Sequence, residues 1–310
     1  MFFRVFAVAT NAYREAVRAR ILYGLFGLAF ATCFYAIVVG GWSVDQQARV
    51  LSDEGTASMS LYGVLVAIVL GATSLHRELE LKTLFPILAR PIFRHEYLVG
   101  KYVGTLLTLT VFVTSYSALL LAALALETGQ KPWLVGVAAL LLLLILGVLL
   151  IRAKYTRVFV LLPWSLAAVA AMAMLAETGS ANRRLVLASM VLAFCESAII
   201  ASIATLFSSF SSPFLTAIFT FAVFVIGRSA DTLARLPPAQ VGAAASKGGA
   251  VLAHVFPNLH LYVPPRPLLL GELPDTPIWP FVAKAALHAG FYSVIGLVIA
   301  SLLFRKRDFT

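Results

Sequence analysis

Long apolar runs recur along the chain and are separated by short polar connections. Eight of them approach or exceed the roughly 18 to 20 residues that a helix needs to cross a hydrocarbon layer about 30 Å thick. They lie at about residues 21–40, 58–75, 97–126, 133–151, 158–176, 185–207, 213–228 and 281–304. The pattern predicts an all-α bundle of eight membrane-spanning helices, in which the run 213–228 is the shortest.

The first 20 residues carry polar and apolar side chains at helical spacing. One face of the expected helix is mainly polar and holds Arg4, Asn11, Arg14, Glu15 and Arg18. The other face is mainly apolar and holds Phe2, Phe6, Tyr13 and Val17. This pattern predicts an amphipathic helix over residues 1–20 that lies in the membrane interface. The alternative is a cytoplasmic extension of the first span.

The longest connection, residues 229–280, holds a small-residue stretch followed by a proline-rich one. The stretch AQVGAAASKGGAVLAHVF is compatible with a short helix, whereas seven prolines in the second half exclude a regular helix there. Apolar side chains such as Tyr262 and Trp279 are too frequent for a solvated linker. We expect an ordered external loop. Residues 1–310 form a single membrane domain on this interpretation, because neither an internal repeat nor a separate soluble segment is visible.

The composition agrees with burial in lipid. Hydrophobic residues make up 61% of the chain and charged residues only 12%, whereas a soluble domain has about 25% charged residues. The net charge is +10, but the charges lie in short connections and not on one face of a folded domain. We therefore expect the basic residues to set the orientation in the bilayer, and we expect no nucleic-acid partner.

The distribution of Lys and Arg predicts which side of the membrane each connection faces. If the N-terminus is cytoplasmic, 15 of the 24 Lys and Arg residues fall on the cytoplasmic side of an eight-span chain. Cytoplasmic connections carry an excess of these residues in membrane proteins. We expect a multi-pass protein of the inner (plasma) membrane with both termini cytoplasmic. Arg183 and Arg184 are exceptions, because this arrangement places them outside.

The spacing of cysteines and histidines indicates neither a metal site nor a catalytic site. Cys33 and Cys195 lie inside apolar runs, where small buried side chains are expected. His254 and His260 are the histidines closest to each other in sequence, and no third ligand accompanies them. We expect no catalytic residue, cofactor site or metal site in this chain.

The connection between the second and third spans, residues 76–101, reads HRELELKTLFPILARPIFRHEYLVGK. Thr83 is a suitable N-cap for a short helix, which would end before Pro91. The apolar face of that helix would hold Leu84, Ile87 and Leu88. A short helix across the cytoplasmic mouth of a bundle is suited to docking against another protein.

This connection resembles the corresponding loop of ABC-2 type permeases, in which a few residues recur at fixed spacing. The matching residues are Glu78, Glu80, Thr83, Pro91, Arg94, Gly100 and Lys101. Lys82 stands where the family usually has Gly. The ending FRKRDFT is also similar to the Phe-x-Arg-Arg-Asp ending of the family. The resemblance covers residues 1–126 and 185–310, and the segment 133–176 adds a pair of helices to the usual six.

The resemblance implies a permease subunit of an ATP-binding-cassette transporter, with export as the expected direction. Two permease subunits, as a homodimer or with a paralogue, would pair with two cytoplasmic ATPase subunits that bind ATP and Mg²⁺. This chain would be no enzyme, since it lacks the Gly-x-x-x-x-Gly-Lys-Ser/Thr loop. The coupling loop, residues 76–94, would contact the ATPase through Glu78, Glu80, Thr83, Leu84, Ile87, Leu88, Pro91 and Arg94.

Glu196 lies at the middle of the run 185–207, where an acidic side chain costs about 2.5 to 3.5 kcal/mol on insertion scales. We expect it to face other helices, either in the transport path or as a polar contact between helices. Ser189 shares its helical face, and Lys284 and His288 are possible partners.

Two other classes of function remain open at this point. A channel or ion-coupled secondary transporter requires intramembrane charges or broken helices with repeat symmetry. A membrane-embedded, lipid-modifying enzyme requires clustered acid, base or metal groups near one interface. A single central carboxylate without a visible repeat or cluster favours neither. The substrate cannot be read from the architecture.

Overall fold

The computed structural model describes residues 2–43, 46–80, 93–153, 156–237, 242–270 and 277–305, and all regular structure within these ranges is helical. The long helices are α1 (Phe2–Val17), α2 (Arg20–Trp42), α3 (Gln47–Glu80), α5 (Arg94–Glu127), α6 (Pro132–Arg152), α7 (Arg157–Leu175), α8 (Ser180–Ser208), α9 (Pro213–Arg228) and α14 (Ile278–Arg305). The shorter ones are η1 (Ala176–Gly179), α10 (Ala230–Ala234), α12 (Ala243–Val255), η2 (Leu259–Tyr262) and α13 (Arg266–Leu270).

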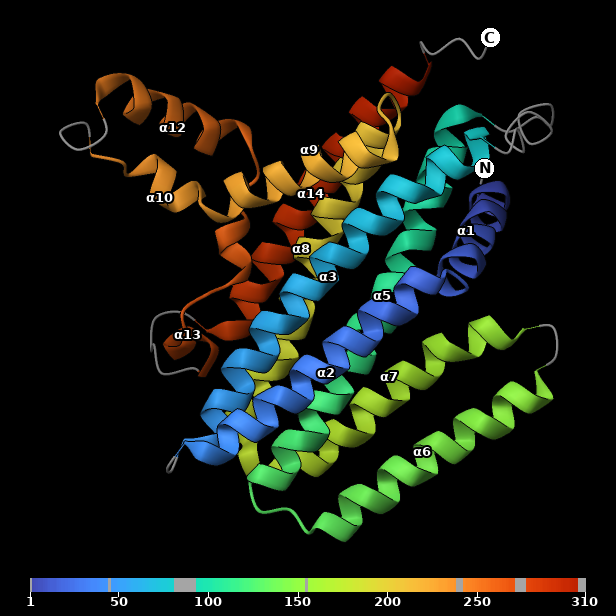
Figure 1. Cartoon of the computed structure of the whole chain (residues 1–310), viewed down its shortest axis with the longest axis vertical. Coiled ribbons are helices and arrows are strands. Elements are labelled where there is room, and N and C mark those ends of the chain that lie inside the picture. The colour runs from blue at the N-terminus through green and yellow to red at the C-terminus, as the bar shows by residue number, and fades with distance from the viewer. Residues whose placement is uncertain are drawn as a thin grey trace.

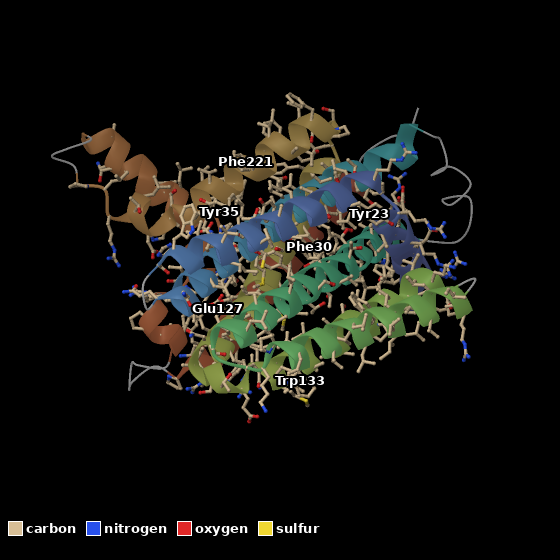
Figure 2. The ribbon with its side chains drawn as sticks, turned by 60° about the horizontal axis from the view of Figure 1, so that its bottom comes forward. Tyr23, Phe30, Tyr35, Glu127, Trp133 and Phe221 are labelled. Atoms are coloured by element: carbon tan, nitrogen blue, oxygen red, sulfur yellow. The ribbon has the colours of Figure 1, made fainter. Side chains whose placement is uncertain are left out.

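Six stretches of the described residues are long and apolar enough to cross a membrane. One of them, Arg157–Ser208, contains both α7 and α8, and α9 is a shorter apolar helix outside the six. Nitrogen atoms gather mainly toward the ends of the bundle, whereas carbon side chains cover its length (Figure 2). The described part of the chain is therefore all-helical and has the character of a multi-pass membrane protein. All eight predicted runs lie within helices, and crossing by all eight stays a prediction.

Helix α8 lies at the centre of the bundle and packs against α3, α5, α9 and α14 (Figure 1). Small residues allow its close approach to α3. A Cβ added at Gly63 would lie 2.7 Å from Oγ of Ser197, and one at Gly71 would lie 2.3 Å from Cβ of Ala204. Packing through small residues is the usual way for apolar helices to associate in lipid.

Helix α1 packs along the first half of α5. Gly100 and Gly104 of α5 lie so close to α1 that an added Cβ would meet Val8 at 2.6 Å and Ala12 at 2.6 Å, respectively. The buried Nζ of Lys101 lies 3.3 Å from the Glu15 carboxylate. Helix α1 thus lies against protein along one side.

The two faces of α1 differ from the simple amphipathic pattern. Tyr13 and Val17 are buried together with Val111 of α5 and neighbouring residues of α7, whereas Phe3 and Phe6 are exposed. The apolar residues therefore divide between protein contact and exposed surface. The exposed ones are available to the membrane interface, where we predicted that this helix lies.

The α6–α7 hairpin lies at one edge of the bundle, with α7 against α5 and α6 outside α7 (Figure 1). Only Val135 of α6 is buried. The indole Nε1 of Trp164 in α7 donates to the Leu142 carbonyl of α6 at 2.8 Å, which ties the two helices together at their middle.

The segment between α9 and α14 consists of short helices. α10 and α12 pack on each other and project from the side of the bundle (Figure 1), whereas η2 and α13 pack against α8. The small-residue stretch forms α12, as its composition suggested. The expectation that the proline-rich half contains no regular helix is wrong for two segments. Helix α13 forms there but has only five residues, and Pro280 lies in the first turn of α14, where a missing N–H costs little.

Candidate functional site

A buried ion pair joins three helices in the interior of the bundle. The Glu196 side chain of α8 is fully buried. Arg228 at the end of α9 donates from Nε to Oε1 of Glu196 at 2.8 Å and from Nη2 to Oε2 at 3.1 Å. Ser60 of α3 accepts from Nη2 of Arg228 at 2.6 Å and donates to Oε2 of Glu196. Both carboxylate oxygens are therefore occupied by charge-assisted hydrogen bonds.

The length of α9 places Arg228 at the depth of Glu196. The chain turns between Ser208 and Pro213, and Ser212 caps the new helix by accepting from the Leu215 N–H. The 16 residues of α9 then rise about 24 Å, while the 12 residues from Ser208 back to Glu196 cover about 18 Å. The guanidinium thus ends its helix near the carboxylate, at the helix C-terminus that favours a cation.

A cavity of about 480 Å³ lies beside the ion pair. Its walls come from the first part of α3, the first half of α8, the end of α9 and the segment from η2 to α13. The polar groups on its walls belong to Arg49, Asp53, Thr56, Ser60, Ser189, Arg228 and Tyr262. Arg228 and Ser60 line the cavity, whereas Glu196 stands behind them. Arg49 and Asp53 form an exposed ion pair at 3.8 Å.

The segment before α13 covers this cavity and is held in place by polar bonds. Asn258 donates to Asp231 at 2.8 Å and accepts from the His260 N–H at 3.0 Å. The Tyr262 hydroxyl donates to the Ala285 carbonyl at 3.1 Å. Burial raises the pKa of Tyr262, so its hydroxyl remains a donor at neutral pH. A Cβ at Gly227 would lie 2.7 Å from the Pro257 carbonyl, so this cover also fixes the residue next to Arg228.

Comparison with protein-family models gave no match, and no curated protein matches the chain at a significant level. The site must therefore be interpreted from its own chemistry.

The partners of Glu196 differ from those that the sequence suggested. His288 contacts the Tyr262 hydroxyl at 2.9 Å and makes no bond to Glu196 among the described residues. Lys284 likewise makes no such bond in that part of the chain. Arg228 and Ser60 take this place. Ser189, expected on the same face as Glu196, lines the adjoining cavity.

Sequence reasoning missed Arg228 because it is the last residue of the short apolar run 213–228, and a basic residue at the end of a run ordinarily marks the membrane surface. The length of the run 213–228 was the signal that could have identified it. A helix of about 16 residues spans about 24 Å, which is less than the roughly 30 Å of the hydrocarbon core. An arginine at the end of such a helix lies within the bundle, where a buried acidic partner is required.

The predicted coupling residues fall at one end of the bundle or outside the described residues. Glu78 and Glu80 lie in the last turns of α3, of which the structure describes the backbone alone. Arg94 begins α5 and donates from Nη1 to the Phe304 carbonyl of α14 at 3.2 Å. The remaining predicted residues are outside the described ranges: Thr83, Leu84, Ile87, Leu88 and Pro91.

The arrangement offers a charged hydrogen-bond donor to a ligand in the cavity. The described residues contain no group of three His, Cys, Asp or Glu side chains that could hold a metal ion. Nη1 of Arg228 has no hydrogen bond within the described part of the chain, so a ligand in the cavity has a charged donor available. Any ligand that competes for Nη2 would loosen the contact among α3, α8 and α9.

Proposed function

We propose that the chain is the permease subunit of an ATP-binding-cassette transporter of the ABC-2 type. The observation that carries the proposal is the spacing of the polar residues in the connection between α3 and α5. Glu78 and Glu80 lie just before this connection and Thr83 lies near its start. Pro91 lies near its end, and Arg94 is the first residue of α5. The multi-pass helical architecture is compatible with such a subunit.

The arrangement of helix ends supports a docking role for this connection. The end of α3, the start of α5, the start of α1 and the end of α14 lie toward the same end of the bundle (Figure 1). The bond from Arg94 to the Phe304 carbonyl joins the start of α5 to the end of α14. A partner that pushes on residues 81–92 would therefore act on two helices that are already linked.

The Gly-Lys pair of the motif has a structural explanation in this chain. Gly100 leaves room for the Val8 side chain of α1, and Lys101 forms the buried ion pair with Glu15. Both contacts join α5 to α1. A displacement at the start of α5 would be passed to α1 through them, because packed helices move as units.

The proposed assembly follows from this assignment. Two copies of a cytoplasmic ATPase would bind ATP and Mg²⁺ and engage residues 76–94, and a second permease subunit would complete the passage. The chain would cross the membrane eight times with both termini cytoplasmic, α1 at the interface and residues 229–280 outside. Glu196 and Arg228 would hold α8 and α9 together or respond to cargo in the cavity.

Purification of the full chain from native membranes tests the proposal. We expect a protein with ATPase activity to co-purify with it. Glu80→Gln and Leu84→Ala should each reduce that co-purification by tenfold or more, because truncating a paired charge at an interface costs about 2 to 5 kcal/mol. Glu177→Gln is the matched control, since this exposed residue lies in η1 at the other end of the bundle.

Two results would contradict the assignment. The first is the absence of an ATPase from the purified complex under conditions that keep the chain folded. The second is equal loss of the ATPase in Glu177→Gln and Glu80→Gln, which would mean that the contact depends on general stability and not on the coupling loop.

A further inference from the structure

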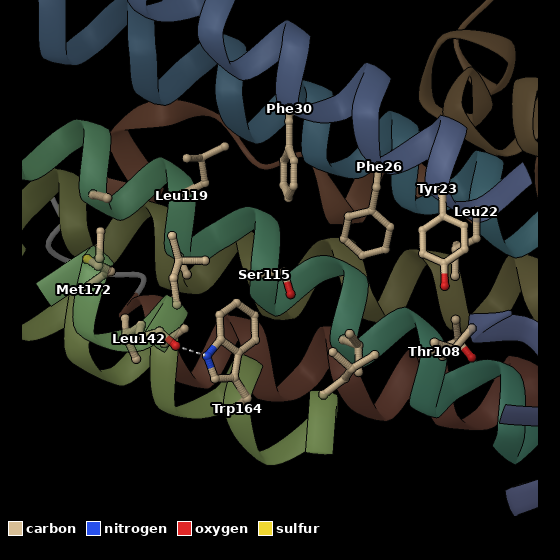
Figure 3. Close-up of a pocket in the computed structure, with 18 residues that line it drawn as sticks. Leu22, Tyr23, Phe26, Phe30, Thr108, Ser115, Leu119, Leu142, Trp164 and Met172 are labelled. Carbon is tan, nitrogen blue, oxygen red and sulfur yellow. Dashed lines mark hydrogen bonds between the residues drawn. The ribbon is translucent and has the colours of Figure 1, made fainter. Parts of the chain in front are cut away.

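A second cavity, of about 490 Å³, lies between α2, α5 and the α6–α7 hairpin (Figure 3). Its walls are almost entirely apolar and include the aromatic rings of Phe26, Phe30 and Trp164. Figure 3 shows the Ser115 hydroxyl directed into the space between these helices. Trp164 bridges to α6 from the far wall through its bond to the Leu142 carbonyl. We call this cavity the lateral crevice.

The chemistry of the walls favours a hydrocarbon occupant over water. A buried water needs two to four polar partners, and the hydroxyl groups that line the crevice belong only to Tyr23, Thr108 and Ser115. The Thr108 hydroxyl already donates to the Gly104 carbonyl at 3.1 Å. Helix α6, which forms the outer wall, is exposed over nearly all of its length. In a bilayer the hydrocarbon next to such a helix is lipid.

The length of the lateral crevice matches one leaflet. Its wall on α5 runs from Thr108 to Ala122, which is about 21 Å of helix, and its wall on α7 runs from Leu161 to Met172, which is about 16 Å. Half of a hydrocarbon core about 30 Å thick is about 15 Å. The space therefore suits a single chain that enters from one side and ends near the bilayer centre.

Three exposed basic side chains surround one end of the crevice. Val17, Leu22 and Leu161 line that end, and exposed Arg18 and Arg20 lie within two residues of Val17 or Leu22. Exposed Arg157 lies one turn before Leu161.

The position of the third arginine is fixed by contacts between α1 and α7. The Tyr13 hydroxyl donates to the Val158 carbonyl at 2.9 Å, which holds the start of α7 beside the end of α1. Burial raises the pKa of Tyr13 to about 12, so this bond persists at neutral pH. Arg14 is close by, with its guanidinium 4.9 Å from the Phe159 ring. At the opposite end of the crevice, the lining residues Ala122, Ala139 and Met172 are uncharged, and Arg183 beside them donates to the Ala173 carbonyl.

We propose that the lateral crevice binds one acyl chain of an anionic phospholipid, whose phosphate lies among Arg18, Arg20 and Arg157. The crevice accounts for the chain and the arginines account for the head group. Basic groups between spanning helices bind anionic head groups in this way, and each arginine near an anionic surface contributes about fivefold in affinity. The lipid would fill the space between the α6–α7 hairpin and α2. This proposal does not depend on the transporter assignment.

Quenching of Trp164 fluorescence provides the test. The full chain with Trp42→Phe, Trp133→Phe and Trp279→Phe retains Trp164 as its single tryptophan. It is reconstituted with phosphatidylglycerol or phosphatidylcholine that carries the same brominated acyl chains. We expect half-maximal quenching at a mole fraction of phosphatidylglycerol at least roughly tenfold lower than that of phosphatidylcholine, because three arginines attract its head group.

Two sets of variants separate the acyl chain from the head group. Combined Arg18→Gln, Arg20→Gln and Arg157→Gln should abolish the preference for phosphatidylglycerol. Arg183→Gln with Arg184→Gln, at the start of α8, should retain it. Ala122→Phe with Ala139→Phe narrows the crevice and should reduce quenching by both lipids. Unquenched emission of Trp164 verifies that each variant is folded.

Equal quenching by both lipids in the parent chain would overturn the head-group assignment. Absence of quenching by either lipid would overturn the acyl-chain assignment. Cross-linking of two copies through Ser115→Cys under those conditions would identify a second copy of the chain as the occupant.

Discussion

Glu196 illustrates how a single residue is accommodated in an apolar interior. Removing a charged partner from a buried pair leaves the other charge without compensation, which destabilises proteins by about 3 to 5 kcal/mol. The pair itself contributes less than this, because both groups lose their hydration. The ion pair is therefore more important for fixing the relative positions of α3, α8 and α9 than for net stability.

The first prediction concerns this pair. Arg228→Gln should lower the free energy of unfolding by about 3 to 5 kcal/mol, because it leaves the Glu196 carboxylate buried without a counter-charge. Combined Glu196→Gln and Arg228→Gln should recover a substantial part of that loss. Arg49→Gln, in the exposed pair with Asp53, is the control and should cost less than about 1 kcal/mol. Reversible unfolding in mixed micelles measures each value.

Additivity of the two single substitutions would contradict the prediction, since it would mean that the two side chains do not interact. A cost for Arg49→Gln as large as that for Arg228→Gln would also contradict it.

Of the two residues in the buried ion pair, only Glu196 could be identified from the sequence. A carboxylate in the middle of a long apolar run is conspicuous, and its burial cost indicates that it faces other helices. Ser60 and Arg228 were not identifiable as its partners. Ser60 is a common residue in an apolar helix. Arg228 lies 32 positions from Glu196, at the end of a run whose depth in the membrane depends on packing.

At the scale of helices, α1 packs closely on α5 because glycines of α5 have no side chain at the contact. A Cβ at Gly104 would lie 2.6 Å from Cβ of Ala12 and 2.7 Å from the Ala9 carbonyl. These atoms belong to a helix backbone or lie directly on it, so they cannot rotate away. The two helices would have to separate.

The second prediction follows from this contact. Gly104→Val should displace α1 and destabilise the protein by about 1 to 3 kcal/mol, as overpacking does. Limited trypsin digestion should then cleave faster after Arg14 and Arg18. Gly136→Val is the matched control, because this residue lies within α6 with nothing within 4 Å of an added Cβ. Equal cleavage of the two variants would show that Gly104 does not hold α1.

The positions of the long helices were predictable from apolar periodicity, and their ends were less so. The run expected at 97–126 corresponds to α5, Arg94–Glu127, which begins three residues earlier and ends one residue later. The run expected at 58–75 is much longer in the structure, since α3 covers Gln47–Glu80. Its first turns carry Gln47 and Arg49, and polar residues of good helical propensity extend a helix beyond the lipid without an apolar signal.

The side of the membrane that each connection faces is a property of the whole molecule. The predicted outward placement of Arg183 and Arg184 departs from the expected cytoplasmic excess of basic residues. Arg183 donates from Nη1 to the Ala173 carbonyl near the end of α7 at 3.3 Å. This bond gives one of the two arginines a structural role that is independent of orientation.

The third prediction addresses this topology. In a background with Cys33→Ala and Cys195→Ala, both Ser180→Cys and Lys247→Cys should react with an impermeant thiol reagent added to intact cells. Asn11→Cys is the control for the opposite side and should react only after the membrane is opened. Labelling of Asn11→Cys in intact cells would reverse the orientation, and failure of both other variants to react would exclude an external location for α12 and the start of α8.

Synthesis of the chain delivers Glu196 to the membrane before Arg228. Only four residues separate α8 from α9, so the two helices can leave the insertion machinery as a closed hairpin. An isolated α8 would expose its carboxylate to lipid, and an isolated α9 would be too short to reach the other surface. Within the hairpin the two charges cancel. Arg228 is therefore neutralised by Glu196 and contributes nothing to the charge signal that orients the chain, which we expect to come from the basic residues around α1 and the coupling loop.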